Sequence, residues 1–393
     1  MKGQVIGMNG SNFSFKDNLA VYKPLSEDVS TEVLVVGGGI TGILSAYYLM
    51  KNGFSVMLAE KNVIGSGNTR YKPGCLNSIP MNNFLKSKNR LGIENTSYIY
   101  NENLKSIDNI ENIINELKLN PGFENRDLFF FTDRENHIDA FTESYKLEKH
   151  TGAEAEFYSK SDGIDLFSFD FEYGIYNKRE GAVLNIVKFA KQLTAYLSLN
   201  GVRIFENTCI SDIMHVKNRY YARTSEGIGI EAKYISDCRG EFTDRANCRK
   251  NSYFTYISKP IMDFRGWHNK CNLTDDYSNP LVFAVIEDRI TVHTQMKNPL
   301  KNTSVYYHMK LSWIEQILNE MFFGIQYIKP EHAFIFNIRE PITKMPALIN
   351  IDKNFLLPLN CFENSVIYAD LLGRAQAEAL RYNKFDIINK FNK

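Results

Sequence analysis

The alternation of apolar and polar residues predicts a β-α-β unit close to the start of the chain. The run VLVV at 33–36 is apolar and β-branched, which is typical of a buried parallel strand. Residues 41–52 then mix apolar and small side chains at helical spacing, and Gly53 is placed to end that helix. The run SVMLA at 55–59 is a second apolar strand. A strand, a helix and a second strand are therefore expected in close succession.

The remaining pattern predicts mixed helices and strands without an internal repeat. Amphipathic spacing predicts helices at 95–119, 138–150, 184–199, 309–322 and 370–382. Short apolar or alternating runs predict strands at 127–133, 155–159, 202–207, 210–216, 219–223, 228–236, 332–338 and 365–369, and a hairpin at 281–295. Residues 65–80 have the composition of a loop.

Length and composition indicate a globular protein of two domains, or of one domain with large insertions. The chain has 393 residues, of which 44% are hydrophobic and 23% are charged, so wholesale disorder is excluded. The net charge is +1, and no long block of one sign stands out. This charge pattern argues against a nucleic-acid partner and against an anionic membrane surface.

Signals for targeting and for metal binding are missing from the sequence. The first 30 residues are polar and lack the apolar core of a signal peptide. No window approaches the ~20 apolar residues of a membrane span. The six cysteines contain no C-x-x-C pair, and the seven histidines contain no H-x-x-x-H spacing. We therefore expect a cytoplasmic protein with reduced thiols and no metal site.

A glycine turn links the first predicted strand to the helix. Gly37, Gly39 and Gly42 have the spacing G-x-G-x-x-G. The first glycine allows the sharp exit from the strand, the second allows a pyrophosphate to approach the backbone, and the third allows the helix to pack closely. The diphosphate would then lie against the N–H groups and positive end of the helix. Glu60, at the end of the second strand, can accept hydrogen bonds from ribose hydroxyls.

The turn by itself leaves the nucleotide open. An acid at position 60 repels a 2′-phosphate, which argues against NADP, but the motif does not separate FAD from NAD. The remaining alternative is a glycine turn that is only structural, in a fold that no longer binds a nucleotide.

Neighbouring motifs resemble a known family. GGGITG at 37–42, AEK at 59–61 and IGSGNT at 64–69 resemble the D-amino-acid oxidase superfamily of FAD-dependent oxidoreductases, which includes glycine and sarcosine oxidases. Residues 184–213 are similar to the family's helix and third parallel strand. YISDCRG at 234–240 is similar to the strand that ends in the family's A-T-G turn, of which Gly240 remains. Coarse similarity covers about residues 30–385.

The resemblance implies an α/β architecture of two domains. A Rossmann-like FAD-binding domain of the GR2 type would comprise 30–78, 175–245 and 335–393. A mixed α+β substrate domain would comprise 79–174 and 246–334, and residues 1–29 would form an N-terminal extension. The flavin ring would lie at the boundary between the two domains.

The resemblance also implies an activity, a cofactor and a set of binding residues. The family oxidises a C–N bond of an amino acid or amine by hydride transfer to FAD, which we expect to be bound non-covalently here. A small amine or amino acid is then the expected substrate, with oxygen or an electron carrier as acceptor. The residues expected to bind FAD are Gly37, Gly39, Ile40, Thr41, Gly42, Glu60, Lys61, Gly65, Ser66, Gly67, Thr69, Arg70, Ile210 and Gly240.

Few residues qualify as substrate contacts. Arg339 lies near the position where glycine-oxidase-like members carry a carboxylate-binding arginine, and its forked guanidinium suits that role. Trp267 and His268 are candidates for the pocket or for the core. His293 falls in the predicted hairpin of exposed type, and we assign it a structural role.

The C-terminal segment departs from the family pattern. Members carry a glycine-rich turn before the last helix, where backbone N–H groups approach the flavin, whereas this chain has NCFENSV at 360–366. From 325 to the end of the chain, Gly373 is the only glycine. Asn360 and Asn364 tolerate left-handed conformations, whereas Phe362 and Val366 resist them. Three readings follow: an FAD-dependent oxidoreductase with an altered ring site, a non-catalytic binding or partner subunit, and an NAD-linked dehydrogenase.

Overall fold

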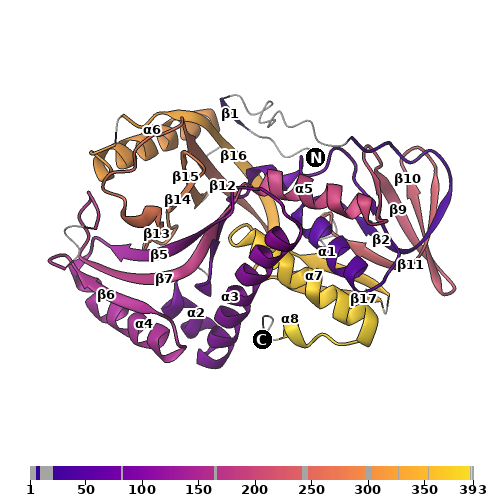
Figure 1. Cartoon of the computed structure of the whole chain (residues 1–393), viewed down its shortest axis with the longest axis horizontal. Helices are drawn as coiled ribbons and strands as arrows, with labels where there is room; N and C mark the ends of the chain where they lie inside the picture. Colours follow the sequence, from indigo (N-terminus) through magenta and orange to yellow (C-terminus); the bar gives the residue numbers. More distant parts are fainter. Residues whose placement is uncertain are drawn as a thin grey trace.

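The computed structural model describes residues 6–8, 21–80, 83–162, 166–240, 247–296, 303–325, 327–352, 354–389 and 391. Two β-sheets lie side by side, each with helices packed on it (Figure 1). We call them the parallel sheet and the large sheet. The strands of the parallel sheet come from three separate stretches of the chain, 29–59, 203–237 and 347–359.

The parallel sheet has a core of five parallel strands. In spatial order they are β18 (Phe355–Leu359), β11 (Gly229–Asp237), β2 (Val29–Val36), β3 (Val56–Ala59) and β8 (Arg203–Phe205). β17 (Ala347–Asp352) pairs antiparallel with β18, and β10 (Arg219–Thr224) and β9 (Ile210–Val216) extend antiparallel from β11. β2 and β3 are joined by α1 (Ile40–Lys51), so the predicted β-α-β unit is confirmed.

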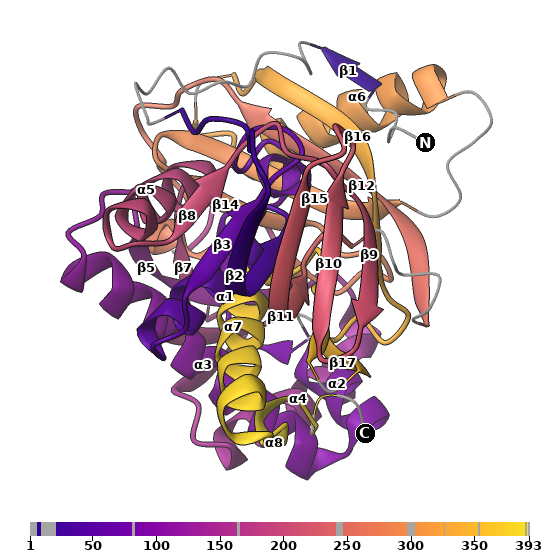
Figure 2. The ribbon, with the colours of Figure 1, turned by 90° about the vertical axis from the view of Figure 1, so that its right-hand side faces the viewer.

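Both faces of the parallel sheet are covered, which explains the continuous apolar runs of β2 and β3. Alternate residues such as Val33 and Val35 face a core shared with four helices: α1, α3 (Ile93–Glu116), α5 (Ile186–Leu199) and α7 (Ser365–Tyr382). Leu34 and Val36 face the opposite side and pack against the β9–β10 extension, which Figure 2 shows beside β11. The short α8 (Asp386–Asn389) follows α7.

The large sheet is mostly antiparallel. Its order is β1 (Ile6–Met8), β16 (Pro330–Pro341), β12 (Cys248–Ser258), β15 (Arg289–Met296), β14 (Val282–Ile286), β13 (Asn272–Asp275), β5 (Glu124–Thr132), β7 (Tyr173–Val183) and β4 (Cys75–Asn77), with β6 (Ala155–Ser159) paired to β7. β13 and β5 are parallel. Short 3₁₀ helices occur at η1 (Asn68–Tyr71), η3 (Glu135–His137) and η5 (His268–Lys270).

Helices cover the two faces of the large sheet. α6 (Thr303–Met321) packs on one face through a cluster that includes Phe254, Phe283 and Ile314. α2 (Phe84–Leu91) and α4 (Ile138–His150) pack near the opposite face at the β5–β7 end, through Phe84, Phe141 and their neighbours (Figure 1).

The predicted strand at 365–369 is wrong, because this segment is the first turn of α7. Residues 365–373 are buried without interruption among α1, α3 and the parallel sheet, so no polar positions mark a helical period. A short apolar run of this kind does not separate a buried strand from a buried helix. The predicted loop at 65–80 contains η1 and β4. The sequence pattern did not predict β7, β12, β17, β18 or α2. The domain boundaries drawn from the resemblance stay a prediction.

Gly373 allows α1 and α7 to pack closely against each other. A Cβ at this position would lie 2.7 Å from Tyr48 Cδ2 and 2.9 Å from the carbonyl oxygen of Leu44. The contact is reinforced by the Tyr48 hydroxyl, which donates to the buried carboxylate of Asp370, and Arg374 pairs with Asp370 at 3.0 Å. The only glycine of the C-terminal segment therefore serves helix packing.

We expect Gly373→Ala to lower the free energy of unfolding by roughly 1–3 kcal/mol, because the added Cβ overpacks the α1–α7 contact. The higher helix propensity of alanine offsets part of this loss. Denaturant titration measures the change. Gly324→Ala is the control, because a Cβ there would make only an ordinary contact, 3.6 Å from the Arg265 carbonyl oxygen. Equal stability of Gly373→Ala and the unmodified protein would contradict the close contact.

Candidate active site at the boundary of the two sheets

Each glycine of the G-x-G-x-x-G turn has a distinct structural reason. Gly37 has φ +106°, and a Cβ there would meet the Cys238 backbone at 3.3 Å. At Gly42 a Cβ would lie 1.9 Å from the Gly37 carbonyl oxygen, so only glycine allows α1 to start against the turn. At Gly39 a Cβ would meet only Thr69 Oγ1, at 3.2 Å. The backbone at Gly39 is therefore accessible from the direction that a ligand would take.

The N-terminus of α1 is suited to an anion. Gly39 is its N-cap residue and supplies no side chain, and the first turn contains no acidic residue. The Ile40 N–H donates to Thr69 Oγ1 at 2.9 Å, and the Thr41 hydroxyl accepts from Asn360 Nδ2 at 2.9 Å. The positive end of the helix dipole thus meets neutral groups alone in this first turn.

Glu60 lies at the end of β3, as the sequence predicts. Its carboxylate is 8% exposed and accepts hydrogen bonds from Gly38 N at 2.6 Å and Asn62 N at 2.9 Å. Lys61, the next residue, is exposed. The carboxylate therefore fixes the backbone of Gly38, in the middle of the glycine turn. Gly38 is next to Gly39, which a pyrophosphate would approach, and is bonded to Glu60, which a ribose would contact.

The loop after β3 folds back over the glycine turn. Gly65 N donates to the Gly38 carbonyl at 2.9 Å, and Ser66 Oγ donates to the Val63 carbonyl at 2.6 Å. Gly67 is exposed and is the residue before η1, which contains Thr69 and Arg70. This loop brings the predicted residues 65–70 and the glycine turn together.

The end of β11 also reaches the glycine turn. Cys238 N donates to the Val36 carbonyl at 2.8 Å, and Gly240 follows with φ +67°. Arg239 pairs with the buried Asp237 at 2.7 Å and donates to the Ile210 carbonyl at 2.7 Å. The predicted residues Ile210 and Gly240 are therefore joined to this end of the sheet through Arg239.

The C-terminal turn at 360–366 replaces glycine with asparagine. Asn364 has φ +54°, and its side chain accepts from Asn77 N at 3.0 Å and donates to the Asn77 carbonyl at 2.9 Å. Asn360 Nδ2 bonds both Thr41 Oγ1 and the Ser365 carbonyl at 2.9 Å. The turn thus joins the N-terminus of α7 to the N-terminus of α1 and to β4.

Phe362 points from this turn onto the large sheet. Its ring lies 4.0 Å from the ring of Tyr253 and 5.2 Å from that of Phe336, measured between centroids. Tyr71 stacks on Phe336 at 5.4 Å. All four side chains are buried, and they form an aromatic cluster at the boundary of the two sheets.

Charged groups surround the aromatic cluster. Glu340 of β16 accepts from Phe362 N at 2.9 Å and from the Tyr253 hydroxyl. Lys72 Nζ donates to the Cys361 carbonyl at 3.1 Å, and burial lowers the pKa of Lys72 to about 8. Burial raises the pKa of Glu363, which Lys344 opposes. Acidic and basic groups are thus held together in a poorly solvated region.

Arg339 is not brought to this place. It is exposed, and it alternates along β16 with Glu340, whose side chain faces the turn. Trp267 stacks on Phe322 at 4.3 Å in the cluster under α6, and the His268 ring lies 5.5 Å from Tyr176. The core interpretation of Trp267 is the one that the structure supports.

Several buried polar atoms near the boundary have no hydrogen-bond partner within the described part of the chain. They are Arg70 Nε, Ser365 Oγ, Thr255 Oγ1 and His293 Nδ1. Unsatisfied buried groups of this kind cost about 1–3 kcal/mol each, so each requires an explanation. Others occur elsewhere among the described residues, such as the Tyr256 hydroxyl and Arg126 Nε. Near the boundary, a bound polar molecule would supply the missing partners.

Comparison with known proteins gives the family. Residues 32–299 match the model of the FAD dependent oxidoreductase (DAO) family. The chain belongs to this family of FAD-dependent oxidoreductases. The resemblance found in the glycine turn and the following loop is thereby confirmed.

Two curated relatives and one solved structure illustrate the family relationship. The chain is 28% identical over 224 residues to the putative Rieske 2Fe-2S iron-sulfur protein YhfW of Bacillus subtilis (strain 168), which covers 56% of this chain and 42% of that protein. It is 22% identical over 216 residues to gamma-glutamylputrescine oxidoreductase of Escherichia coli (strain K12), which covers 55% and 50%. The chain spans about half the length of these curated relatives.

The fold is shared with glycine oxidase from Geobacillus kaustophilus. The TM-score is 0.74 at 14% identity, and the match covers 89% of this chain and 94% of that one. The Rossmann-like sheet beside a second mixed sheet is thus the fold that the sequence predicts.

The boundary fits the cofactor of the family. FAD carries phosphate oxygens, ribose hydroxyls and a ring with polar edges. The N-terminus of α1 has no cap from its own N-cap residue Gly39, although Thr69 accepts from the Ile40 N–H. Together with Arg70 Nε and Ser365 Oγ at the start of α7, which have no hydrogen-bond partner among the described residues, it offers donors for such groups. Asn364 retains the left-handed conformation at the C-terminal turn. The FAD-dependent oxidoreductase therefore keeps donors at both ends of the boundary despite its missing glycines.

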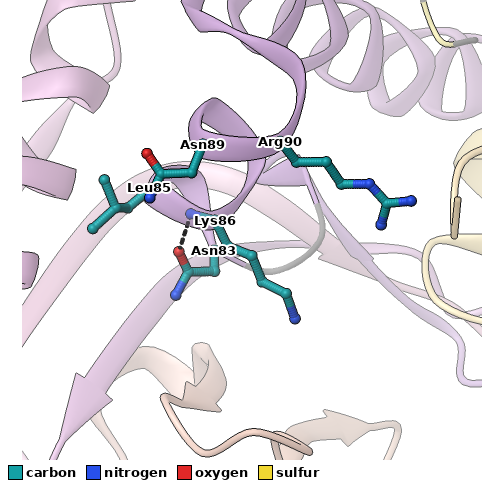
Figure 3. Close-up of a pocket in the computed structure, with 5 residues that line it drawn as sticks. All are labelled: Asn83, Leu85, Lys86, Asn89 and Arg90. Atoms are coloured by element: carbon teal, nitrogen blue, oxygen red, sulfur yellow. Dashed lines mark hydrogen bonds between the residues drawn. The ribbon is translucent and has the colours of Figure 1, made fainter. Parts of the chain in front are cut away.

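A shallow cavity, widely open to solvent, lies beside the boundary. It has a volume of about 420 Å³ and is lined by Asn83, Leu85, Lys86, Asn89 and Arg90 of α2 and its N-cap (Figure 3). Burial is the main cause that lowers the pKa of Lys86, and Lys344 and Arg90 act in the same direction while Glu363 opposes them. The cavity is thus basic and close to the turn. A second cavity of about 190 Å³ lies under α6.

Two features are absent from the described residues. No helix among them is long and apolar enough to cross a membrane. No group of three or more histidine, cysteine or acidic side chains among them is arranged to hold a metal ion. All six cysteines are free.

Sequence reasoning missed the residues that the large sheet contributes. The hairpin that contains His293 is not exposed, because β12 and β13 pair on its two sides, and His293 is 3% exposed. The continuous apolar run VFAVI of β14 was the signal for a buried strand. Tyr253 and Glu340 come from strands whose pairing joins distant segments, and no local pattern indicates that they meet.

The lowered pKa of Lys72 predicts a rise in stability with pH. Between about pH 8 and pH 10.5 the folded chain has released a proton that the unfolded chain still holds on Lys72, so raising the pH favours folding. Lys72→Met should reduce this rise in the free energy of unfolding, measured by denaturant titration across the range. Lys51→Met, at an exposed position, is the control. An unchanged slope in Lys72→Met would contradict the burial of this amine.

Proposed function

We propose that this FAD-dependent oxidoreductase oxidises a C–N bond of an amino acid or secondary amine by hydride transfer to non-covalently bound FAD. The observation that carries the proposal is the junction at Asn360, where the N-termini of α1 and α7 meet over the aromatic cluster of the large sheet. Two helix N-termini at one place favour a ligand with a diphosphate and a polar ring edge.

Each part of the proposed site has a chemical task. The N–H groups at the start of α1 would bind the diphosphate, and Glu60 would bind the adenosine ribose. Arg70 Nε and Ser365 Oγ, which have no hydrogen-bond partner among the described residues, would bind polar groups of the cofactor. When bound, FAD supplies the hydride acceptor. Phe362, Tyr253 and Tyr71 exclude water from the place where the transfer occurs.

The basic cavity supports a substrate that carries a carboxylate. Lys86 and Arg90 extend from the same helix in Figure 3, and the described residues that line the cavity include no acidic side chain. The names of the relatives, a glycine oxidase and a gamma-glutamylputrescine oxidoreductase, agree with amines and amino acids as substrates.

The electron acceptor in the second half-reaction is oxygen or a carrier protein. A relative named as a Rieske iron-sulfur protein favours a carrier, because the region similar to this chain is less than half of that protein. A carrier would accept electrons from the reduced flavin, and the chain itself would hold substrate and cofactor.

The visible absorption spectrum of the purified protein is the first test. We expect a flavin spectrum, release of FAD on denaturation, and bleaching of the flavin by at least one compound in a panel of amino acids and secondary amines. A bound flavin that no amine reduces would favour the non-catalytic reading. A colourless protein that takes up no added FAD would contradict the proposal.

Gly39→Val tests the position of the cofactor. The branched side chain would fill the space in front of α1, where a Cβ meets only Thr69 Oγ1, so flavin content should fall at least about 10-fold while the fold is retained. Lys51→Ala, at the exposed end of the same helix, is the matched control and should retain flavin. Equal flavin content in both variants would place the cofactor elsewhere.

A further inference from the structure

Two unpaired polar side chains lie opposite each other on the large sheet. Thr255 of β12 and His293 of β15 are direct partners in the antiparallel register, so their side chains share one face. They are 5% and 3% exposed, and neither Thr255 Oγ1 nor His293 Nδ1 has a hydrogen-bond partner among the described residues. Two neighbouring buried groups therefore lack the partner that each requires.

This pair faces the proposed cofactor site. The row that contains Thr255 and His293 also contains Phe334, and the next row contains Tyr253, whose ring contacts that of Phe362. The His293 ring lies edge-on to the Phe362 ring at 5.6 Å. The unpaired pair is thus beside the turn at 360–366.

The pair is electrically neutral. Burial lowers the pKa of His293 to about 3, so the imidazole carries no charge at neutral pH. Charged side chains around the turn come from the other packed elements: Glu340 of β16, Glu363 of the turn, Lys344 and Lys72. Thr255 and His293 therefore offer hydrogen bonds without an electrostatic preference for a cation.

A neighbouring threonine on the same face differs from this pair because its hydroxyl has a partner. Thr291 lies on the same strand and face, two residues before His293, and is also buried. Its Oγ1 donates to the Ala284 carbonyl at 3.2 Å. A buried hydroxyl on this face is thus satisfied at one position and left unsatisfied at the next.

We propose that Thr255 and His293 bind the amino nitrogen of the substrate in its uncharged form. This inference rests on the proposed oxidation of a C–N bond and specifies how that substrate is held. In such a reaction the C–H bond breaks, hydrogen and both bonding electrons leave as hydride to FAD, and the nitrogen lone pair forms the C=N bond of an iminium ion. An ammonium ion has no lone pair for this step. A neutral imidazole nitrogen accepts the amine N–H, and it contributes no negative charge that would keep the amine protonated.

Histidine NMR on ¹⁵N-labelled, FAD-loaded protein tests the contact directly. His293→Asn identifies the His293 signals by their loss. Glycine and L-proline are the amine probes, and acetate and tetrahydro-2-furoate are matched analogues without an N–H group. The amines should shift the His293 ring-nitrogen signals and the analogues should not. No shift with either amine, or equal shifts with amines and analogues, would overturn the proposal and leave an ordered water as the occupant.

A pair of threonine variants separates binding from structure. Thr255→Val should weaken amine binding about 10-fold, the loss expected for one hydrogen bond, without loss of FAD or of thermal stability. Thr291→Val should lower thermal stability, because it removes a buried hydrogen bond to the Ala284 carbonyl, and should leave amine affinity unchanged. Equal effects of both variants on amine affinity would overturn the proposal. If the protein is colourless and its His293 signals still respond to amines, the proposed amine contact stands and the proposed oxidase activity fails.

Discussion

The contact between α1 and α7 is the constraint on which the candidate site depends. Gly373 lets the two helices approach until side chain meets backbone, and the Tyr48–Asp370–Arg374 interactions hold them there. Because each helix begins at the same end of this contact, their N-termini meet at Asn360. Two positive helix ends are thereby fixed at the boundary of the sheets. A change in the packing at Gly373 would move both helix N-termini at once, although Gly373 itself lies away from the proposed ligand.

The boundary excludes solvent and contains both acidic and basic side chains. The aromatic cluster excludes solvent, while Lys72, Glu340 and Glu363 surround it from three different segments. Interactions between charges are stronger in such surroundings than in water. In a family whose other members place glycine backbone against the flavin, this chain uses side chains that carry their own hydrogen-bond requirements. The chemistry of the ring environment is therefore expected to differ, although the fold is shared.

The β-α-β unit was predictable because every signal in it is local: three glycines, two apolar strands and an acid lie within one short stretch. The segment 365–369 was misassigned because burial on all sides removes the helical period. The expected role of Arg339 depended on an alignment, whereas the structure brings Glu340 to the turn. His293 and Thr255 are adjacent only through strand pairing, and no pattern within either strand indicates it. Nucleotide sites built from one turn can be read from sequence, but sites assembled across a sheet cannot.

The turn at 360–366 is held by side-chain contacts to distant segments of the chain. Asn364 makes a strand-like contact with the backbone of Asn77, and Glu340 accepts from the backbone of Phe362. Glycine at 364 would adopt the left-handed conformation without strain but would remove both side-chain hydrogen bonds to the Asn77 backbone in a buried place. A substitution in this turn therefore also changes the anchoring of β4 or β16, so the turn and these strands are constrained together.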